Sequence, residues 1–346
     1  MINELTEQLS RGSSLTIEQM TNVMNEILTG TQNDDDVAQF LKNLTQKGES
    51  DDELLGMLNK MEEYSVHISP NCNGKIIDVC GTGGDKLKTF NISTTASFVI
   101  AGAGGNVAKH GNRSVSGISG SADIFEYFGF NLHSESWIVE EMIEKLGIGF
   151  MFAPTFHPAM KNVAPARKIL GKRTAFNLLG PLCNPANVKH QLIGVFADEY
   201  ISRIVKIMQK NHSETILAVR SEDGMDELST TSKNRVCMLK NNDISEFIID
   251  PEEYNMKKGS LSDIQISTKQ EAIDAFVSVL NNSSNKTMKE ITILNAAGGM
   301  MVGGLCDAFK EGVELATETI NNGKAFKKLE QFAKENNAQE KLEEIN

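Results

Sequence analysis

Beyond residue 74, short apolar segments alternate with longer segments of helical periodicity. The expected strands are residues 75–80, 105–109, 149–153, 191–196, 215–220, 235–239 and 246–249. The expected helices are residues 93–103, 121–128, 136–146, 157–170, 200–209, 268–280, 286–301 and 306–346, the last with a break at 321–323. This alternation predicts an α/β domain with a central, largely parallel sheet, in which ligands bind at the carboxyl ends of the strands.

Residues 16–64 predict helices only. Thr16 with Gln19, and Ser50 with Glu53, have the spacing of capping boxes. Apolar residues recur at helical spacing within 17–28, 37–44 and 54–61, and the apolar face left over suits the main domain or a second subunit. Residues 67–74 indicate a linker, because they contain Pro70, Asn71, Asn73 and Gly74. We expect a small helical domain over 1–66, joined by helices from about 170–190, and an α/β domain over 75–346.

The charge balance excludes some classes of function. The 346-residue chain has a formal net charge of −12, which suits neither nucleic acid nor an anionic membrane surface. It has no apolar run long enough to span a membrane, and its N-terminus lacks the pattern of a signal peptide. The five scattered cysteines match no zinc or redox spacing, so we expect reduced thiols and a cytoplasmic location.

A glycine-rich stretch follows the first expected strand. Gly81-Thr82-Gly83-Gly84-Asp85 leads to Asn91, Ser93 and Thr94 at the start of a helix. Free amides and the positive end of the helix dipole make such a place a phosphate site, although a plain strand–turn–helix connection also fits. The stretch matches neither the dinucleotide fingerprint nor the Walker loop.

Three further stretches carry candidate chemistry. Residues 109–121 combine Lys109, His110 and Arg113 with serines and glycines, which favours phosphate binding over a solvated loop. Residues 220–228 hold four carboxylates, and beside two phosphate loops they become a candidate Mg²⁺ site. In residues 157–185, Arg167 is a candidate ligand for a second anion, such as a substrate carboxylate.

Together these stretches resemble the anthranilate phosphoribosyltransferase family. The resemblance is carried by residues 81–85, 91–94, 109–113 and 176–181, in the order and spacing of the family, and runs from about residue 5 to about residue 330. It implies a helical domain joined to an α/β domain, with the active site in the hinge cleft and a homodimer through the N-terminal helices. It also implies Mg²⁺-dependent transfer of the phosphoribosyl group from 5-phosphoribosyl pyrophosphate (PRPP) to the anthranilate amine, the second step of tryptophan biosynthesis from chorismate.

The resemblance also implies site residues. Ser93, Asp226 and Glu227 would hold Mg²⁺, with two ions per subunit. Gly81, Asn112 and Arg167 would contact anthranilate, and His110 and His157 would line its channel. The PRPP ligands would be Gly81, Gly84, Asp85, Thr89, Asn91, Ile92, Ser93, Thr94, Lys109, His110, Gly111, Asn112, Arg113, Ser114, Val115, Ser116, Gly117 and Ser121. At Gly117-Ile118 the chain departs from the family, which more often has hydroxyl or basic residues there.

Two alternatives stay open at this point. A pyrimidine nucleoside phosphorylase would need a phosphate pocket but no paired acids for Mg²⁺, so Asp226 and Glu227 argue against it. A non-catalytic relative that binds nucleic acid is disfavoured by the negative charge of the chain.

Overall fold

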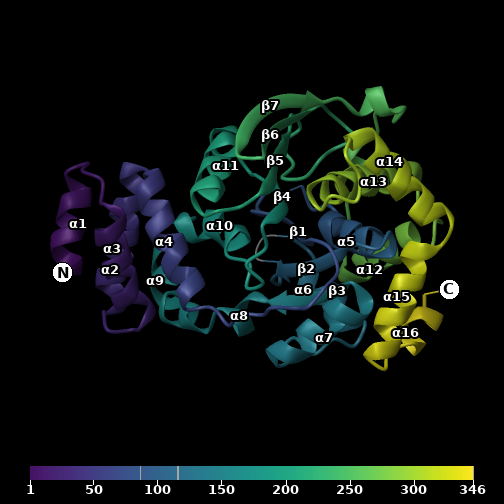
Figure 1. Ribbon diagram of the computed structural model, residues 1–346. Coiled ribbons are helices and arrows are strands. Elements are labelled where there is room, and N and C mark those ends of the chain that lie inside the picture. Colours follow the sequence, from purple (N-terminus) through teal and green to yellow (C-terminus); the bar gives the residue numbers. More distant parts are fainter. Residues whose placement is uncertain (86, 115–116, 346) are drawn as a thin grey trace. The chain divides into compact units, whose positions relative to one another are not determined.

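The computed structural model describes residues 1–85, 87–114 and 117–345. The chain divides into two compact units (Figure 1). Unit 1 comprises Met1–His67 and Ala153–Asn187, and unit 2 comprises Ile68–Phe152 and Val188–Asn346. The second segment of unit 1 therefore begins at Ala153, earlier than the 170–190 segment that the sequence suggested.

Unit 1 is all helical. Its first segment forms α1 (Ile2–Ser10), α2 (Ile17–Leu28), α3 (Asp34–Lys47) and α4 (Asp51–Glu63). Both predicted capping boxes are present, at Thr16 and at Ser50. Its second segment forms α8 (Ala153–Phe156), α9 (Ala164–Leu170), α10 (Ala175–Leu179) and the 3₁₀ turns η1 (Pro158–Asn162) and η2 (Gly180–Leu182).

The prediction of one helix over 157–170 is wrong. Pro158 and Pro165 stand at the first turns of η1 and α9, where a missing amide is tolerated. Inside a continuous helix each proline would remove a hydrogen bond and clash with the preceding turn. The segment therefore folds as two short pieces that meet at Val163.

Unit 2 is built on a seven-stranded sheet. Its strands are β1 (Ile76–Gly81), β2 (Asn106–Gly111), β3 (Ile148–Phe152), β4 (His190–Gly194), β5 (Thr215–Ser221), β6 (Asn234–Lys240) and β7 (Asp243–Ile249). Their order is β3-β2-β1-β4-β5-β6-β7. The first five strands in this order, β3 to β5, are parallel to one another, whereas β6 pairs antiparallel with both β5 and β7. The prediction of a largely parallel sheet is confirmed.

Helices cover this sheet (Figure 1). Helices α5 (Ile92–Gly102) and α13 (Lys286–Val302) pack on β1, and α11 (Ile201–Lys210) packs on β5. Helix α7 (Ser136–Leu146) packs on β3. The other α-helices are α6 (Ser121–Tyr127), α12 (Lys269–Leu280), α14 (Phe309–Asn321), α15 (Lys324–Glu335) and α16 (Glu340–Glu343), and short 3₁₀ turns lie at Asp198–Tyr200, Pro251–Tyr254 and Leu261–Asp263.

Beyond the break expected at 321–323, the C-terminal segment is not the one continuous helix that the sequence predicts. It breaks again after Glu335 and buries Leu329 and Phe332. The Phe332 ring lies 5.6 Å from that of Phe98 and 5.4 Å from that of Phe125, centroid to centroid. The last helices therefore close part of the core of unit 2.

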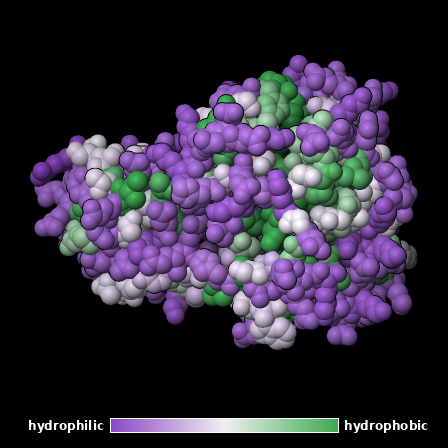
Figure 2. Space-filling view, viewed as in Figure 1, coloured by the Kyte–Doolittle hydropathy of each residue, from purple (hydrophilic) through white to green (hydrophobic). Residues whose placement is uncertain are grey.

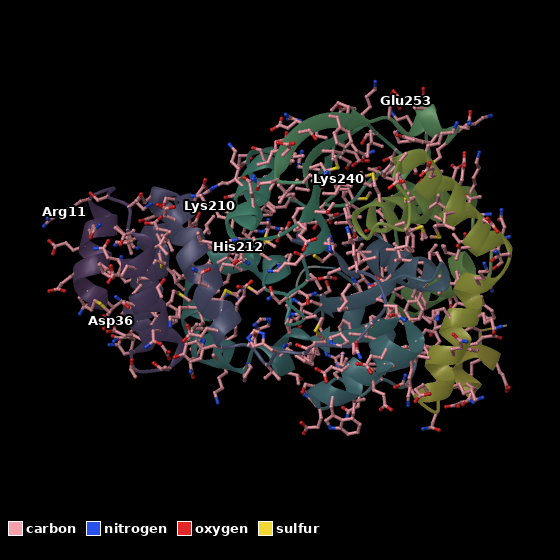
Figure 3. All side chains as sticks on the ribbon, in the orientation of Figure 1. Arg11, Asp36, Lys210, His212, Lys240 and Glu253 are labelled. Carbon is pink, nitrogen blue, oxygen red and sulfur yellow. The ribbon has the colours of Figure 1, made fainter. Side chains whose placement is uncertain are left out.

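The face of the molecule shown in Figure 2 is mostly polar. Charged side chains such as Arg11, Lys210 and Glu253 are exposed and point outward (Figure 3). Strand β7 is an exception, because Phe247 and Ile248 on this edge strand are exposed. Among the described residues, no helix is long and apolar enough to cross a membrane.

Candidate functional site

The site begins where the strand order changes direction. Strands run outward from β1 to β2 and β3 on one side, and from β4 to β5 on the other. Connections that diverge between two neighbouring parallel strands leave a crevice at their carboxyl ends, where ligands bind in such sheets. Here β1 and β4 end at Gly81 and Gly194, which pair in register.

The loops after these strands are tied together. The amide of Thr82 donates to the carbonyl of Gly194 at 2.9 Å, and the Thr82 hydroxyl oxygen accepts from the amide of Phe196 at 3.0 Å. The turn at Gly83 and Gly84 needs positive φ angles, of 73° and 88°, which glycine adopts without strain. The glycine stretch is thus a fixed turn at the crevice.

The acidic loop after β5 enters the same crevice. The amide of Gly83 donates to Oδ2 of Asp226 at 2.5 Å. A Cβ atom placed on Gly81 would lie 2.6 Å from Asp226 Oδ2, and one on Gly194 would lie 1.6 Å from the Asp226 carbonyl oxygen. Glycine at both strand ends is therefore what allows Asp226 to lie this close to the sheet.

The pKa values of the adjacent acids Asp226 and Glu227 are both raised. Burial raises the pKa of Asp226, and the charge of Asp85 raises it further. Burial likewise raises the pKa of Glu227, and the charge of Asp226 raises it further. The positive charge of Lys109 partly offsets these two effects on the pKa of Glu227. Carboxylates crowded in this way are stabilised by a bound cation.

Ser93 and Lys109 complete this cluster. The Ser93 hydroxyl hydrogen-bonds Glu227. The ammonium of Lys109, a residue that is 2% exposed, donates to the Val79 carbonyl at 2.7 Å and lies 3.5 Å from the Ser93 hydroxyl. Ser93, Asp226 and Glu227 fit Mg²⁺, which takes one or two carboxylates and fills its other positions with water and substrate oxygens. Among the described residues, no group of three or more His, Cys, Asp or Glu is arranged to hold a metal ion.

The amino end of α5 faces this cluster through Ser93. Asn91, the N-cap residue, makes no capping hydrogen bond, and its buried Oδ1 has no partner among the described residues. The side chains of Ile92 and Thr94 are buried, so these two residues can offer a ligand only their backbone amides. An uncapped helix start of this kind can bind a phosphate group.

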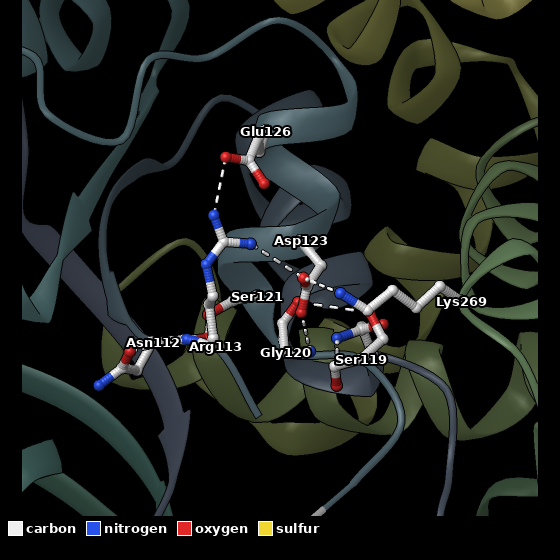
Figure 4. Close-up of polar contacts among 9 residues, drawn as sticks. Asn112, Arg113, Ser119, Gly120, Ser121, Asp123, Glu126 and Lys269 are labelled. Carbon is white, nitrogen blue, oxygen red and sulfur yellow. Dashed lines mark hydrogen bonds and ion pairs between the residues drawn. The ribbon is translucent and has the colours of Figure 1, made fainter. Parts of the chain in front are cut away.

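The second phosphate-type loop follows β2 (Figure 4). The Asn112 carbonyl accepts from the Ser121 hydroxyl and from the Ala122 amide, each at 3.3 Å, so the loop returns to the start of α6. A Cβ atom on Gly111 would overlap Ser121 Oγ at 2.1 Å. The amide of Gly117, where the chain departs from the family, donates to Ser114 Oγ at 2.6 Å. Val115 and Ser116 lie outside the described residues.

Arg113 is held by acids of α6. Its guanidinium lies 3.1 Å from Asp123 and 2.7 Å from Glu126 (Figure 4). Lys269, at the start of α12, also contacts Asp123, at 2.8 Å. Burial would raise the pKa of Asp123, but the bonds from Lys269, Gly120 and Arg113 hold it below its usual value. No motif near Lys269 in the sequence indicates that its ammonium pairs with Asp123.

The remaining predicted PRPP ligands of unit 2 lie along the same loops. Asp85 Oδ1 accepts from the Leu87 amide at 3.0 Å, and Thr89 forms an isolated bridge with Gln265. His110 is buried, with 7% of its surface exposed, and is the second-last residue of β2 before the loop. The sequence stretches singled out for phosphate and Mg²⁺ therefore converge at one end of one sheet.

Arg167 and His157 belong to unit 1. Arg167 Nη2 lies 3.4 Å from Asn177 Oδ1, and its guanidinium stands 5.7 Å over the Phe176 ring. Burial lowers the pKa of Arg167, and no salt bridge to it is present in the described part of the chain. Burial also lowers the pKa of His157 to about 4, against the opposing effect of bonds to the backbone of Cys183 and Met61.

Sequence reasoning noted Asp223 only as one of four acids, but the structure gives it a distinct role. Its carboxylate accepts from the hydroxyls of Ser221, Ser229 and Thr231. Burial would raise the pKa of Asp223, and these hydroxyl bonds outweigh it and lower the pKa. Asp223 thus braces the acidic loop from within, which serine and threonine spacing around it could have indicated.

Comparison with known proteins finds relatives over nearly the whole chain. The family described as glycosyl transferase family, a/b domain matches residues 73–326, and its helical bundle domain matches residues 3–65. The anthranilate phosphoribosyltransferase of Nitrosopumilus maritimus is 58% identical, covering 100% of this chain and 99% of its own length, and that of Cenarchaeum symbiosum is 43% identical over 94% and 95%.

Solved structures give the same match. The crystal structure of anthranilate phosphoribosyltransferase from Thermus thermophilus superposes with a TM-score of 0.89 at 33% identity, covering 96% of this chain and 99% of that one. A Saccharomyces cerevisiae structure in complex with PRPP and Mg has a TM-score of 0.88 at 24% identity, over 97% and 98%, and shares the fold.

Proposed function

The chain belongs to the anthranilate phosphoribosyltransferases of the glycosyl transferase family, and from this premise we propose that it joins anthranilate to PRPP. The products are N-(5-phosphoribosyl)anthranilate and pyrophosphate, in the second step of tryptophan biosynthesis from chorismate. The observation that carries the proposal is the convergence of two glycine-rich loops with the Asp226–Glu227 pair at the crevice between β1 and β4.

Binding of PRPP is the task of unit 2. The amides of the Gly81–Gly84 turn and the start of α5 supply donors for phosphate oxygens. The loop after β2 adds its own amides and hydroxyls. Arg113 can bind a phosphate oxygen if its ion pairs with Asp123 and Glu126 break. We assign PRPP to the residues that the family resemblance names in this unit.

Ser93, Asp226 and Glu227 would hold Mg²⁺, and we propose two ions per subunit. When bound, Mg²⁺ neutralises negative charge on the pyrophosphate leaving group. The protein residues hold PRPP in place while the bond from C1 to the pyrophosphate oxygen breaks and the bond from C1 to the amine nitrogen forms, with loss of one proton from that nitrogen. Positioning and electrostatics are therefore the main contributions of the chain.

For anthranilate we propose Arg167 as the ligand of the carboxylate. A half-buried guanidinium without a salt bridge in the described chain is suited to an anionic substrate. Gly81 and Asn112 would contact the same substrate, and His110 and His157 would line its channel. His157 stays neutral at physiological pH and so adds no competing charge.

We also propose a homodimer through the N-terminal helices and a cytoplasmic location. Hydrophobic residues are visible among the polar ones over these helices in Figure 2. All five cysteines are free, as is usual in a reducing compartment. A monomeric mass in solution scattering would contradict the dimer.

The fluorescence of anthranilate tests the function. Purified protein with PRPP and Mg²⁺ should decrease it, and omission of either should stop the decrease. The matched comparison is the same protein with phosphate and thymidine, where release of thymine would instead support the phosphorylase alternative. The curated relatives favour the transferase over that alternative.

A further inference from the structure

Two buried asparagines grip consecutive residues of the acidic loop. Asn295, on α13, accepts from the Leu228 amide at 3.0 Å and donates to the Leu228 carbonyl at 2.7 Å. Asn234, at the start of β6, accepts from the Ser229 amide at 2.7 Å and donates to the Ser229 carbonyl at 2.9 Å. Both side chains are fully buried. Each amide therefore binds the loop backbone as a neighbouring strand would.

The side chain of Leu228 is fixed as well. Leu228 is fully buried, and a Cβ atom on Gly298 would lie 3.3 Å from its Cδ1. Gly298 is three residues beyond Asn295 and therefore on the same face of α13. Because Gly298 has no side chain, the Leu228 side chain fits against α13, while Asn295 binds the amide and the carbonyl of Leu228.

Helix α13 is itself seated directly on β1. A Cβ atom on Gly299 would lie 2.9 Å from Cγ1 of Val79, and one on Gly303 would lie 2.1 Å from Cδ1 of Ile77. Val79 and Ile77 belong to the strand that ends at Gly81. One helix thus sets the position of both the glycine turn and the residue that follows Glu227.

We propose that Asn295 and Asn234 are positioning residues that hold Asp226 and Glu227 in place for the divalent cation. We call each asparagine, with the backbone groups that it binds, a clamp. This inference rests on the proposed function. Leu228 directly follows Glu227, so a loosened Leu228 backbone displaces the acid beside it. Asp223 braces the loop internally, whereas the two asparagines attach it to α13 and to the sheet. Groups that orient metal ligands typically change metal affinity by about 10- to 100-fold when removed.

Binding of Mn²⁺, a substitute for Mg²⁺, tests the clamp without measuring turnover. The free Mn²⁺ signal in electron paramagnetic resonance gives the dissociation constant in the presence of PRPP. Asn295→Ala should weaken Mn²⁺ binding by about 10- to 100-fold. Asn295→Asp keeps the acceptor for the Leu228 amide but sets a buried carboxylate oxygen against the Leu228 carbonyl, so it should weaken Mn²⁺ binding as well. Asn234→Asp provides the same measurement at the second clamp if the Asn295 variants do not fold.

Thr292→Ala is the matched control. Thr292 is equally buried on α13, and its hydroxyl donates to the Met288 carbonyl of the same helix at 2.9 Å. It should lower the melting temperature yet leave Mn²⁺ binding unchanged. Unchanged binding in the asparagine variants, or equal weakening in Thr292→Ala, would overturn the clamp. Wild-type protein that neither binds Mn²⁺ with PRPP nor consumes anthranilate would instead contradict the proposed function, and the clamp with it.

Discussion

The amide of Gly83 donates a 2.5 Å hydrogen bond to Oδ2 of Asp226, a residue 143 positions further along the chain. This contact joins the glycine turn after β1 to the acidic loop after β5. The turn proposed to bind phosphate and the carboxylate proposed to bind the cation are therefore joined by one hydrogen bond.

Replacing Gly194 by alanine should separate the two loops. The new Cβ would overlap the Asp226 carbonyl oxygen at 1.6 Å, so the acidic loop must move. A displacement of about 1 Å in a catalytic site can lower the rate by about 100-fold, and we expect a fall of that order in kcat/KM for PRPP. Gly180→Ala is the control for stability, since its Cβ meets nothing within 4 Å. Wild-type kcat/KM in Gly194→Ala would contradict the close approach.

Asp226→Asn should abolish Mg²⁺-dependent turnover and stabilise the metal-free protein. Because folding raises the pKa of Asp226, the folded state holds a proton that the unfolded state releases above about pH 4. The metal-free protein therefore loses stability as the pH rises from about 4 through the raised pKa. At pH 8 in a chelator the variant should melt at least about 2 °C higher than wild type, while its Mg²⁺-dependent turnover is lost.

The pH dependence of that gain is the decisive part. As the pH falls through about 4, the acid becomes protonated in the unfolded state as it already is in the folded state, so the gain in melting temperature should shrink. An equal gain at pH 4 and pH 8 would mean that desolvation and the Asp85 charge are not its cause.

His157 should make unit 1 sensitive to acid. Its pKa is lowered to about 4 in the folded chain, against about 6.5 when unfolded. The unfolded state binds the proton first as the pH falls, so stability is complete above about pH 6.5 and declines toward pH 4. The loss amounts to about 3 kcal/mol. Urea unfolding at several pH values should show a smaller loss in His157→Gln than in wild type. The loss that remains includes that of His190, whose pKa burial also lowers to about 4. Parallel curves for the two proteins would contradict the role of His157.

Arg167→Ala should raise the KM for anthranilate by about 10-fold or more, because a hydrogen bond to a charged group contributes about 1.5–3 kcal/mol. The KM for PRPP should not change. Lys168→Ala is the matched control, because Lys168 is the exposed neighbour on α9. A rise in the KM for PRPP in place of that for anthranilate would assign Arg167 to the other substrate.

The sequence predicts all seven strands because each is a local run of apolar residues, and the capping boxes mark two helix starts. It does not predict the break at Val163, where two prolines interrupt an apparently continuous helical pattern. Partners that lie far apart in the chain, such as Lys269 with Asp123 or Asn295 with Leu228, leave no local signal. Their contacts arise only once the sheet order is fixed.

We propose that unit 2 binds PRPP through Mg²⁺ held by Ser93, Asp226 and Glu227. Isothermal titration of PRPP into the protein, without anthranilate, measures this binding by itself. With Mg²⁺ we expect one PRPP per chain, and we expect binding at least about 10-fold weaker with chelator or in the Asp226→Ala, Glu227→Ala double variant. PRPP binding that is absent from wild type, or equally tight in the double variant, would rule out this mode of binding.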